Sequence, residues 1–159
     1  MSTTNLYEDL PPRQFWRKAV AEQNVLTTTD LWYKKFDIDL EEKIASAGSC
    51  FAQHISKRML KSGFNYQDLE TAPPGLPAES HIEFSYSTYS ARYGNIYTTA
   101  QLLELAEEAF GKRPSLDYSW DKNGCFIDPL RPNVEPEGLK SHDEVQYHRQ
   151  FHLKKLKQL

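Results

Sequence analysis

A short apolar segment, a glycine-containing turn and an amphipathic helix follow one another at residues 43–63, and this order constrains the fold more than any other feature. Residues 43–47 are uncharged after Lys43 and carry small side chains, which is typical of a buried parallel strand. Gly48 and Ser49 interrupt this segment, and Gly63 provides a left-handed stop for the helix. The apolar positions of the helix are Phe51, Ile55 and Met59. We therefore predict part of a β-α-β unit, and with it an α/β fold.

Two capping boxes predict two further helices. In each, a hydroxyl side chain precedes a Glu or Gln by three positions, so that both side chains can bond to free amides of the first turn. The pairs are Thr98 with Gln101 and Ser141 with Glu144.

The rest of the sequence predicts one strand, one loop and an N-terminal lead-in. Residues 82–89 alternate apolar and polar side chains, which indicates a strand. Prolines and a glycine mark residues 67–81 as a loop. We expect residues 1–40 to be irregular and residues 41–159 to form the folded domain.

The charge and composition exclude several classes of protein. The chain has 159 residues, with 19 Lys and Arg against 22 Asp and Glu, so its net charge is -3. This balance argues against a nucleic acid partner. No segment approaches the roughly 18 apolar residues of a membrane span, and the N-terminus does not read as a signal peptide. We expect a cytoplasmic protein.

The sequence predicts neither a disulfide framework nor a metal or cofactor site. Cys50 and Cys125 are two isolated cysteines, and no four-ligand zinc pattern can be assembled. His148 and His152 are four residues apart on a predicted helix, but we interpret them as surface residues. The aromatic content of 13% and the mean hydropathy of -0.68 suggest an irregular or incomplete domain.

The residues best suited to chemistry lie at the turn between the predicted strand and helix. Gly48 permits a tight turn, and the first amides of the helix can hold an oxyanion. The positive helix end favours a thiolate, which makes Cys50 a candidate nucleophile, with Ser49 beside it. Two structural alternatives stay open: Ser49 is an N-cap, and Cys50 is a small buried hydrophobic residue. His54 lies among basic residues, and we interpret it as part of a solvated face.

Residues 48–52 read Gly-Ser-Cys-Phe-Ala, the motif that names the GSCFA domain family of bacterial proteins. Further segments resemble this family in the same order, at residues 15–16, 90–98, 128–132 and 152–153. On this resemblance the chain is identified as the N-terminal portion of a GSCFA domain. The family resembles the SGNH/GDSL-type hydrolases, which implies ester hydrolysis or acyl transfer. It also implies a partial flavodoxin-like three-layer sandwich with a parallel sheet, truncated at its C-terminus.

The resemblance also assigns roles to individual residues. Cys50 falls where these hydrolases carry their nucleophilic serine, and Ser49 falls where they carry an aspartate, so either side chain is a candidate nucleophile. Gly94 and Asn95 match the block that helps to bind the oxyanion, together with Gly48 at the turn. The alternative for Gly94 and Asn95 is a simple turn before the next helix.

The acid and base of a catalytic triad are missing from this assignment. Hydrolases of this type carry both near the C-terminal end of the domain, and we do not take His142, His148 or His152 as the base. We expect a His from beyond residue 159 to act as base, and the chain alone to be weakly active or inactive. The implied substrate is a small-molecule or saccharide acyl ester.

Two alternatives without catalysis remain. The chain is a saccharide-binding or assembly module whose aromatic side chains line one face, or it pairs with another chain through an exposed sheet edge. The aromatic residues concerned are Tyr86, Tyr89, Tyr93, Tyr97, Tyr118 and Trp120. The sequence does not predict an oligomeric state.

Overall fold

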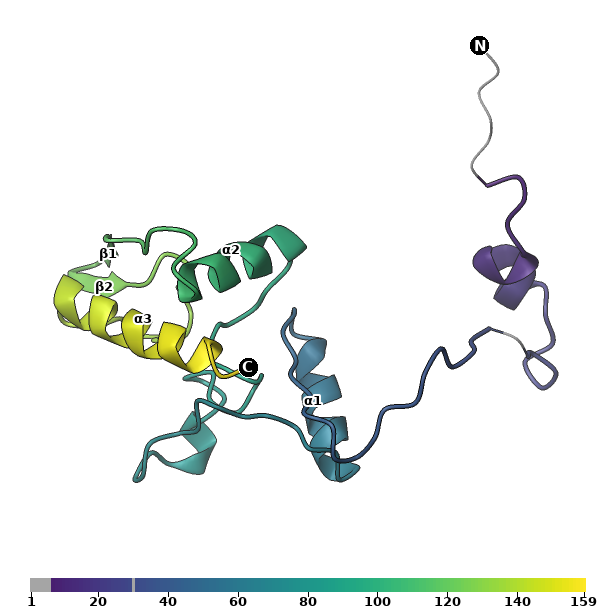
Figure 1. Cartoon of the computed structure of the whole chain (residues 1–159), viewed down its shortest axis with the longest axis horizontal. Coiled ribbons are helices and arrows are strands. Elements are labelled where there is room, and N and C mark those ends of the chain that lie inside the picture. Colours follow the sequence, from purple (N-terminus) through teal and green to yellow (C-terminus); the bar gives the residue numbers. More distant parts are fainter. Residues whose placement is uncertain (1–6, 30) are drawn as a thin grey trace, which may run out of the picture. The chain divides into compact units, whose positions relative to one another are not determined.

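The chain divides into two units, Met1–Ile38 and Asp39–Leu159, and the computed structural model describes residues 7–29 and 31–159 (Figure 1). In the first unit a 3₁₀ helix, η1, spans Pro12–Gln14, and a π-helix, η2, spans Arg17–Ala21. Ala19 is buried in this unit, whereas Trp16 is exposed. Within the described part of the chain, no helix has the length and apolar character needed to cross a bilayer.

The second unit consists of three α-helices, one short 3₁₀ helix and one hairpin, joined by long irregular segments. In chain order these are α1 (Ala52–Lys61), η3 (Ala78–Ser80), α2 (Thr99–Ala109), β1 (Trp120–Lys122), β2 (Cys125–Ile127) and α3 (His142–Leu156). The two strands pair antiparallel, and α3 contacts both β2 and α2 (Figure 1).

The predicted parallel sheet and flavodoxin-like three-layer sandwich are wrong for this structure. Among the described residues the sheet is the two-stranded antiparallel β1–β2 hairpin. Residues 43–47 do not form a strand, and their parallel pairing is limited to one bridge, between Ile44 and Tyr66. Ser46 bonds instead to Ser90: its N–H donates to the Ser90 hydroxyl at 2.9 Å, and its carbonyl accepts from the Ser90 N–H at 3.3 Å. The Ser90 hydroxyl therefore accepts the hydrogen bond that a backbone carbonyl of a neighbouring strand would accept in a sheet.

The predicted strand at residues 82–89 is also wrong, because this segment is a series of turns. Ser85 and Ser87 have φ angles of 58° and 50°, in the left-handed region that a strand excludes. The alternation of apolar and polar residues there reflects turns rather than a pleated strand.

Both predicted capping boxes are confirmed. The Thr98 hydroxyl accepts from the Gln101 N–H at 3.1 Å, and the Ser141 hydroxyl accepts from the Glu144 N–H at 3.1 Å. The Gln101 and Glu144 side chains reach back to the backbone N–H groups of Tyr97 and Lys140, one residue before each cap. Local chemistry therefore sets where α2 and α3 begin.

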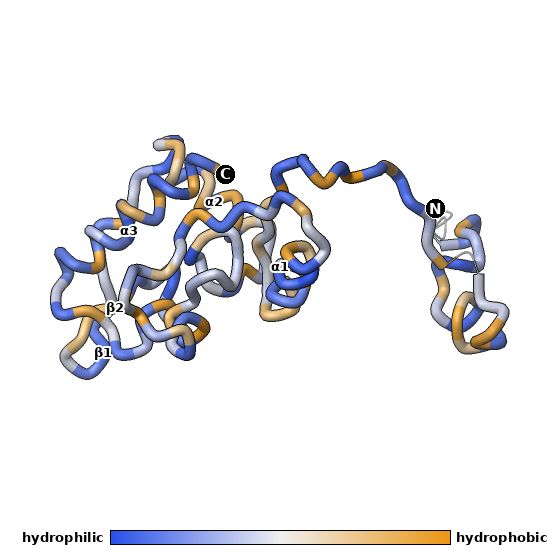
Figure 2. Tube along the Cα trace, turned by 90° about the horizontal axis from the view of Figure 1, so that it is seen from below, coloured by the Kyte–Doolittle hydropathy of each residue, from blue (hydrophilic) through white to orange (hydrophobic). Residues whose placement is uncertain are grey.

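Helix α1 packs through small residues rather than through its large apolar ones. Its buried side chains are Ala52 and Ser56, and the Ser56 hydroxyl donates to the Thr88 carbonyl at 3.0 Å. Phe51 and Ile55, predicted to face inward, are 77% and 54% exposed. Figure 2 shows hydrophobic residues of α1 interspersed with hydrophilic ones. Small side chains allow close approach of the helix to the neighbouring backbone, and the larger apolar groups are left outside.

The segment of residues 88–93 forms the centre of the second unit, because all six of its side chains are buried. Around it lies one apolar cluster that joins α1, α2 and α3. Its buried members are Ala52, Tyr89, Ala91, Tyr93, Ile96, Leu105, Ala109 and Leu153.

A buried network of ion pairs surrounds this small core. Arg149, on α3, donates to both carboxylate oxygens of Glu108 on α2, at 2.7 and 2.5 Å, and to Asp128 at 2.7 Å. Asp128 also accepts from Arg131 at 3.0 Å, and Arg131 donates to the carbonyl of Arg92 at 3.1 Å. The network therefore connects two helices to the loop after β2 and to the central segment.

Arg92 extends the network to the other side of the central segment. Its guanidinium donates to the Phe84 and Val134 carbonyls and to the Glu135 carboxylate, at 2.7–2.9 Å. Its backbone N–H donates to Glu70 at 2.6 Å. Each contact satisfies a polar group that burial would otherwise leave without a partner.

We predict that Arg149→Met destabilises the protein by about 3–5 kcal/mol, because Glu108 and Asp128 would remain buried without their shared cation. Urea unfolding at neutral pH measures the change. Arg113→Met is the matched control, since Arg113 is 45% exposed and pairs with Glu104 and Glu107 at the surface. Its loss should change the free energy of unfolding by about 1 kcal/mol at most. Equal effects of the two substitutions would contradict the role of the network.

Candidate functional site

The turn before α1 presents Cys50 to solvent. Cys50 is exposed, Ser49 is half-buried, and both cysteines of the chain are free thiols. Helix α1 begins at Ala52 with Phe51 as its N-cap, so Cys50 lies two positions before the first helical residue. The side chain of Ser49 does not cap the helix, and Cys50 is not a buried hydrophobic residue, so both structural alternatives fail.

Gly48 fits closely against the start of the helix. A Cβ at this position would lie 3.0 Å from the Cβ of Ala52, so the turn tolerates a larger residue only if its neighbour shifts. The Ala52 N–H donates to the Ser49 carbonyl at 2.8 Å, which closes the turn around Cys50. The Gly48 carbonyl accepts from the Ile96 N–H at 2.9 Å.

That last hydrogen bond brings the predicted oxyanion residues to the turn. Gly94 has a φ of 67°, a conformation suited to glycine, and Asn95 follows it with an exposed side chain. The Tyr89 hydroxyl donates to Asn95 Oδ1 at 2.5 Å, and Asn95 Nδ2 donates to the Tyr97 hydroxyl at 3.0 Å. The predicted residues at positions 48–50 and 94–95 therefore belong to neighbouring segments, although the sequence separates them by more than 40 positions.

Tyr89 links this surface to the core. Its ring is buried against Tyr93, with the two centroids 5.8 Å apart. Burial raises the pKa of Tyr89, a hydrogen bond with Gln53 lowers it, and the neighbouring charge of Cys50 raises it. The net shift is upward, so the hydroxyl keeps its proton at neutral pH and acts as a donor to Asn95.

The four histidines considered at the sequence level, His54, His142, His148 and His152, range from exposed to fully buried. His54 is exposed on α1, as expected from its basic neighbours. His142 lies 3.6 Å from Asp117, and His148 lies 3.4 Å from Glu135. The interpretation of His152 as a surface residue is wrong, because it is 1% exposed and its Nδ1 lies 2.6 Å from Glu70 Oε2.

The Glu70–His152 pair has the geometry of an acid that orients an imidazole. Burial, and after it the charge of Arg131, lower the pKa of His152 to about 4, against the opposing effects of Glu70 and Asp128. Burial alone would raise the pKa of Glu70, but the hydrogen bond from His152, the hydrogen bond from the Arg92 N–H and the charge of Arg131 lower it overall. At neutral pH a carboxylate therefore accepts from a neutral imidazole.

The other nitrogen of this imidazole, Nε2, is buried and has no hydrogen-bond partner. Because it does not reach solvent, His152 is not placed to take a proton from a bound substrate. The edge of its ring packs against Tyr93, with the two ring centroids 6.1 Å apart. The pair connects α3 to the central segment, and this is its structural role.

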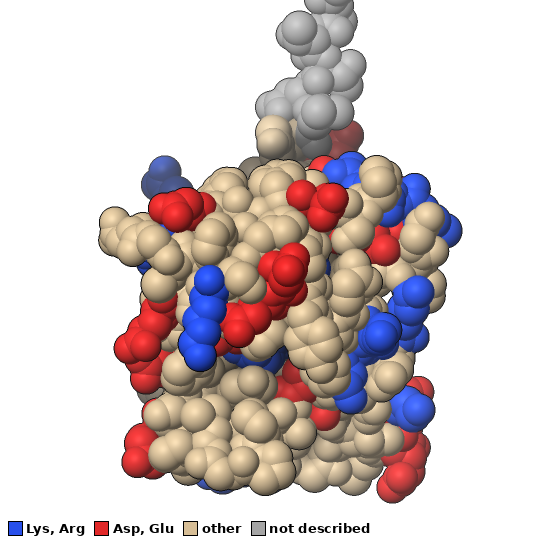
Figure 3. Space-filling model, turned by 90° about the vertical axis from the view of Figure 1, so that its left-hand side faces the viewer, with Lys and Arg blue, Asp and Glu red and all other residues tan. Residues whose placement is uncertain are grey.

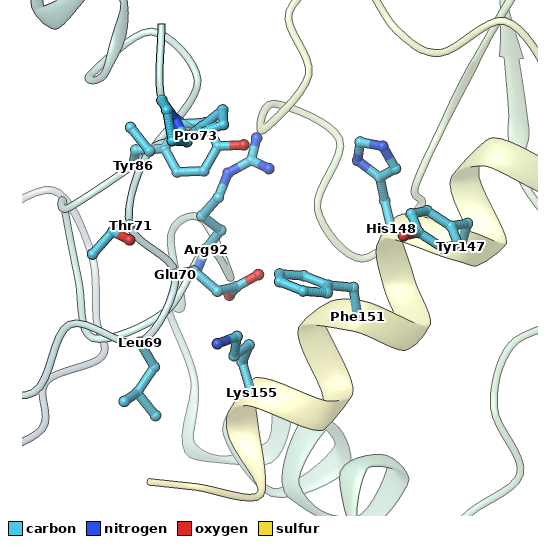
Figure 4. A pocket seen from close by; sticks show the side chains of 12 residues that line it. Leu69, Glu70, Thr71, Pro73, Tyr86, Arg92, Tyr147, His148, Phe151 and Lys155 are labelled. Atoms are coloured by element: carbon cyan, nitrogen blue, oxygen red, sulfur yellow. The ribbon is translucent and has the colours of Figure 1, made fainter. Parts of the chain in front are cut away.

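A cleft of about 380 Å³ opens beside the pair, between α3 and the segments around residues 70 and 86 (Figure 4). Tyr147, His148, Phe151 and Lys155 reach it from α3, and Glu70 and Arg92 lie on its other side. Sequence reasoning missed this cleft, because its two walls are far apart in the chain. Its signal in the sequence is the four-residue spacing of Tyr147, Phe151 and Lys155, which places all three on one face of α3.

The described residues contain no cluster of three or more His, Cys, Asp or Glu side chains that could hold a metal ion. Figure 3 shows basic and acidic side chains interspersed on one face of the molecule.

The buried neutral His152 predicts a loss of stability in mild acid. Between pH 6.5 and about 4 the unfolded chain binds a proton at this residue that the folded chain does not. The free energy of unfolding should therefore fall by up to about 1.4 kcal/mol per pH unit across this range. His152→Asn should flatten the decline between pH 7 and 5, whereas His54→Asn, at an exposed position, should leave it unchanged. Unfolding by urea at several pH values gives the slopes, and parallel slopes for His152→Asn and the original chain would refute the assignment.

A comparison with models of protein families supports the family that the motif at the turn indicates. The model of the GSCFA family matches residues 43–159, which is most of the chain and includes the whole of the turn before α1. The searches of curated proteins and of solved structures returned no match. The chain therefore belongs to the GSCFA family.

Proposed function

We propose that this chain carries the nucleophile and the oxyanion-binding groups of an acyl-ester hydrolase or acyltransferase, with Cys50 as the nucleophile. The observation that supports this most is the hydrogen bond from the Ile96 N–H to the Gly48 carbonyl, at 2.9 Å. It holds the Gly94–Asn95 turn next to an exposed thiol at the start of a helix. This is the arrangement expected from the resemblance to Gly-Asp-Ser hydrolases.

Two features favour Cys50 over Ser49. Cys50 is exposed, whereas Ser49 is half-buried. A thiol is also a stronger nucleophile than a hydroxyl that lacks an adjacent base. We assign none of these imidazoles as the base. His152 is buried, and His142 and His148 contact Asp117 and Glu135, neither of which belongs to the turn before α1.

The proposed reaction uses a small-molecule or saccharide acyl ester. The Cys50 sulfur attacks the acyl carbonyl carbon, and the carbonyl oxygen becomes an oxyanion that accepts from the Asn95 amide and from amides at the start of α1. The ester C–O bond then breaks, the alcohol leaves with the proton that the Cys50 thiol gave up, and a thioester remains on Cys50. Water or an acceptor hydroxyl attacks the thioester, which releases the acid or the new ester and regenerates the thiol.

We predict that p-nitrophenyl acetate acetylates Cys50. Incubation should release p-nitrophenol and add the mass of one acetyl group to the peptide that contains residue 50, as measured by peptide mass spectrometry. Cys50→Ala should abolish this adduct and lower p-nitrophenol release to the buffer rate. Ser49→Ala should retain both.

Cys125→Ala is the matched control, because Cys125 is also a free thiol but is half-buried in β2. It should not change the rate of p-nitrophenol release. The proposal fails if Cys50→Ala releases p-nitrophenol as fast as the original chain, or if the acetyl group is found on other residues.

A further inference from the structure

We infer that the cleft between α3 and the segments around residues 70 and 86 binds a neutral saccharide. Its volume of about 380 Å³ lies within the range of small-molecule sites, which is about 300–1,000 Å³. The inference is independent of the chemistry proposed for Cys50, since none of the residues at the turn lines this cleft.

Aromatic rings form the walls of the cleft. Phe151 and Tyr147 are 49% and 72% exposed at its rim, and Tyr86 lies on the opposite side (Figure 4). Exposed rings beside a cleft are suited to stacking against the apolar C–H face of a sugar ring. Tyr89 and Tyr93, which the sequence suggested as part of an aromatic face, are buried in the core and take no part.

The position of Tyr86 is held at a conformational cost. Ser85 and Ser87 on either side of it both have positive φ angles, a conformation that non-glycine residues seldom adopt. The Arg92 guanidinium lies over the ring of Tyr86, 4.0 Å from its centroid. Strain of this kind is concentrated at functional sites, where the surrounding structure maintains it.

The charges that face the cleft select against a strongly charged ligand. Glu70 contributes a carboxylate, and Lys155 contributes an ammonium on the same side as Phe151, whose ring centroid lies 5.5 Å away. Arg92 is already paired with Glu135, at 2.9 Å, and His148 also lies beside Glu135. The lining therefore carries both signs of charge, so neither an anion nor a cation meets a set of partners of one opposite sign.

A hydroxyl group satisfies both kinds of partner. It donates to a carboxylate and accepts from an ammonium. Glu70 is 5% exposed and its Oε2 already accepts from the Arg92 N–H and from His152, so one sugar hydroxyl would bond to Glu70 Oε1 and another to Lys155. Figure 4 shows Lys155 and the ring of Phe151 both directed toward Glu70. A neutral sugar has both features that the cleft can recognise: hydroxyl groups for the charged side chains and an apolar face for the ring of Phe151.

The test is a titration of the ¹⁵N-labelled protein with glucose, galactose, mannose, xylose and N-acetylglucosamine, each in a separate experiment. We expect at least one sugar to give saturable shifts of the amide signals of residues 147–155 and 69–72. Phe151→Ala should weaken its binding about tenfold through loss of the stacked ring. Lys155→Gln should weaken it too, and both variants should unfold at the temperature of the original chain, because neither side chain is fully buried.

Phe110→Ala is the matched control, because Phe110 is 61% exposed and lines a different, apolar groove beside α2. It should bind the same sugar with unchanged affinity. The inference is overturned if no sugar gives saturable shifts, or if Phe151→Ala binds as tightly as Phe110→Ala. It is also overturned if glucuronate or glucosamine binds more tightly than every neutral sugar.

Discussion

The buried ion pairs between α2, α3 and the central segment are the interaction on which the rest of this domain depends. The apolar cluster is small, and several of its members are alanines, so hydrophobic burial alone connects the helices weakly. Arg149 joins Glu108 to Asp128, and Arg131 continues from Asp128 to the backbone of Arg92. Such a network gives little net stability compared with an apolar core of the same volume, but the loss of any one partner leaves a buried charge uncompensated. It therefore fixes which segments lie together.

The same network positions both surfaces to which we assign a function. Arg92 and Glu70 are members of it and also form one side of the cleft. The central segment continues directly into Gly94 and Asn95, and from there to the hydrogen bond between Ile96 and Gly48. The exposed thiol and the cleft are thus both attached to one buried stretch of chain.

Features that depend on neighbouring residues could be predicted from the sequence. Both capping boxes are complete within a few positions of Thr98 and Ser141, and α2 and α3 begin where these residues require. The turn and the helix end single out Cys50 without any resemblance, but the approach of residues 94–96 to the turn could be anticipated only through the family resemblance. Nothing local to either segment specifies their contact.

The remaining features depend on partners far away in the chain. A parallel sheet needs neighbouring strands, and an apolar segment such as residues 43–47 has the same pattern whether or not they are present. Phe51 and Ile55 have the spacing of a buried helical stripe. The face of α1 that is buried carries Ala52 and Ser56 instead, because their small side chains let the helix approach the backbone of the central segment. The interpretation of His152 as a surface residue was wrong because hydrophobic periodicity assigns polar residues to the surface. Its buried partner, Glu70, lies 82 positions away in the chain, so no local pattern indicates the pair.

The most direct test of this account is the rate of hydrogen exchange at the arginine side chains. If the network is buried and intact, the Nε–H groups of Arg92, Arg131 and Arg149 should exchange only when the whole domain unfolds, with rates that match the most protected backbone amides. The Nε–H of Arg113, which lies at the surface, should exchange far faster. Exchange at Arg149 as fast as at Arg113 would show that the network is open to water, and would contradict the central role given to it here.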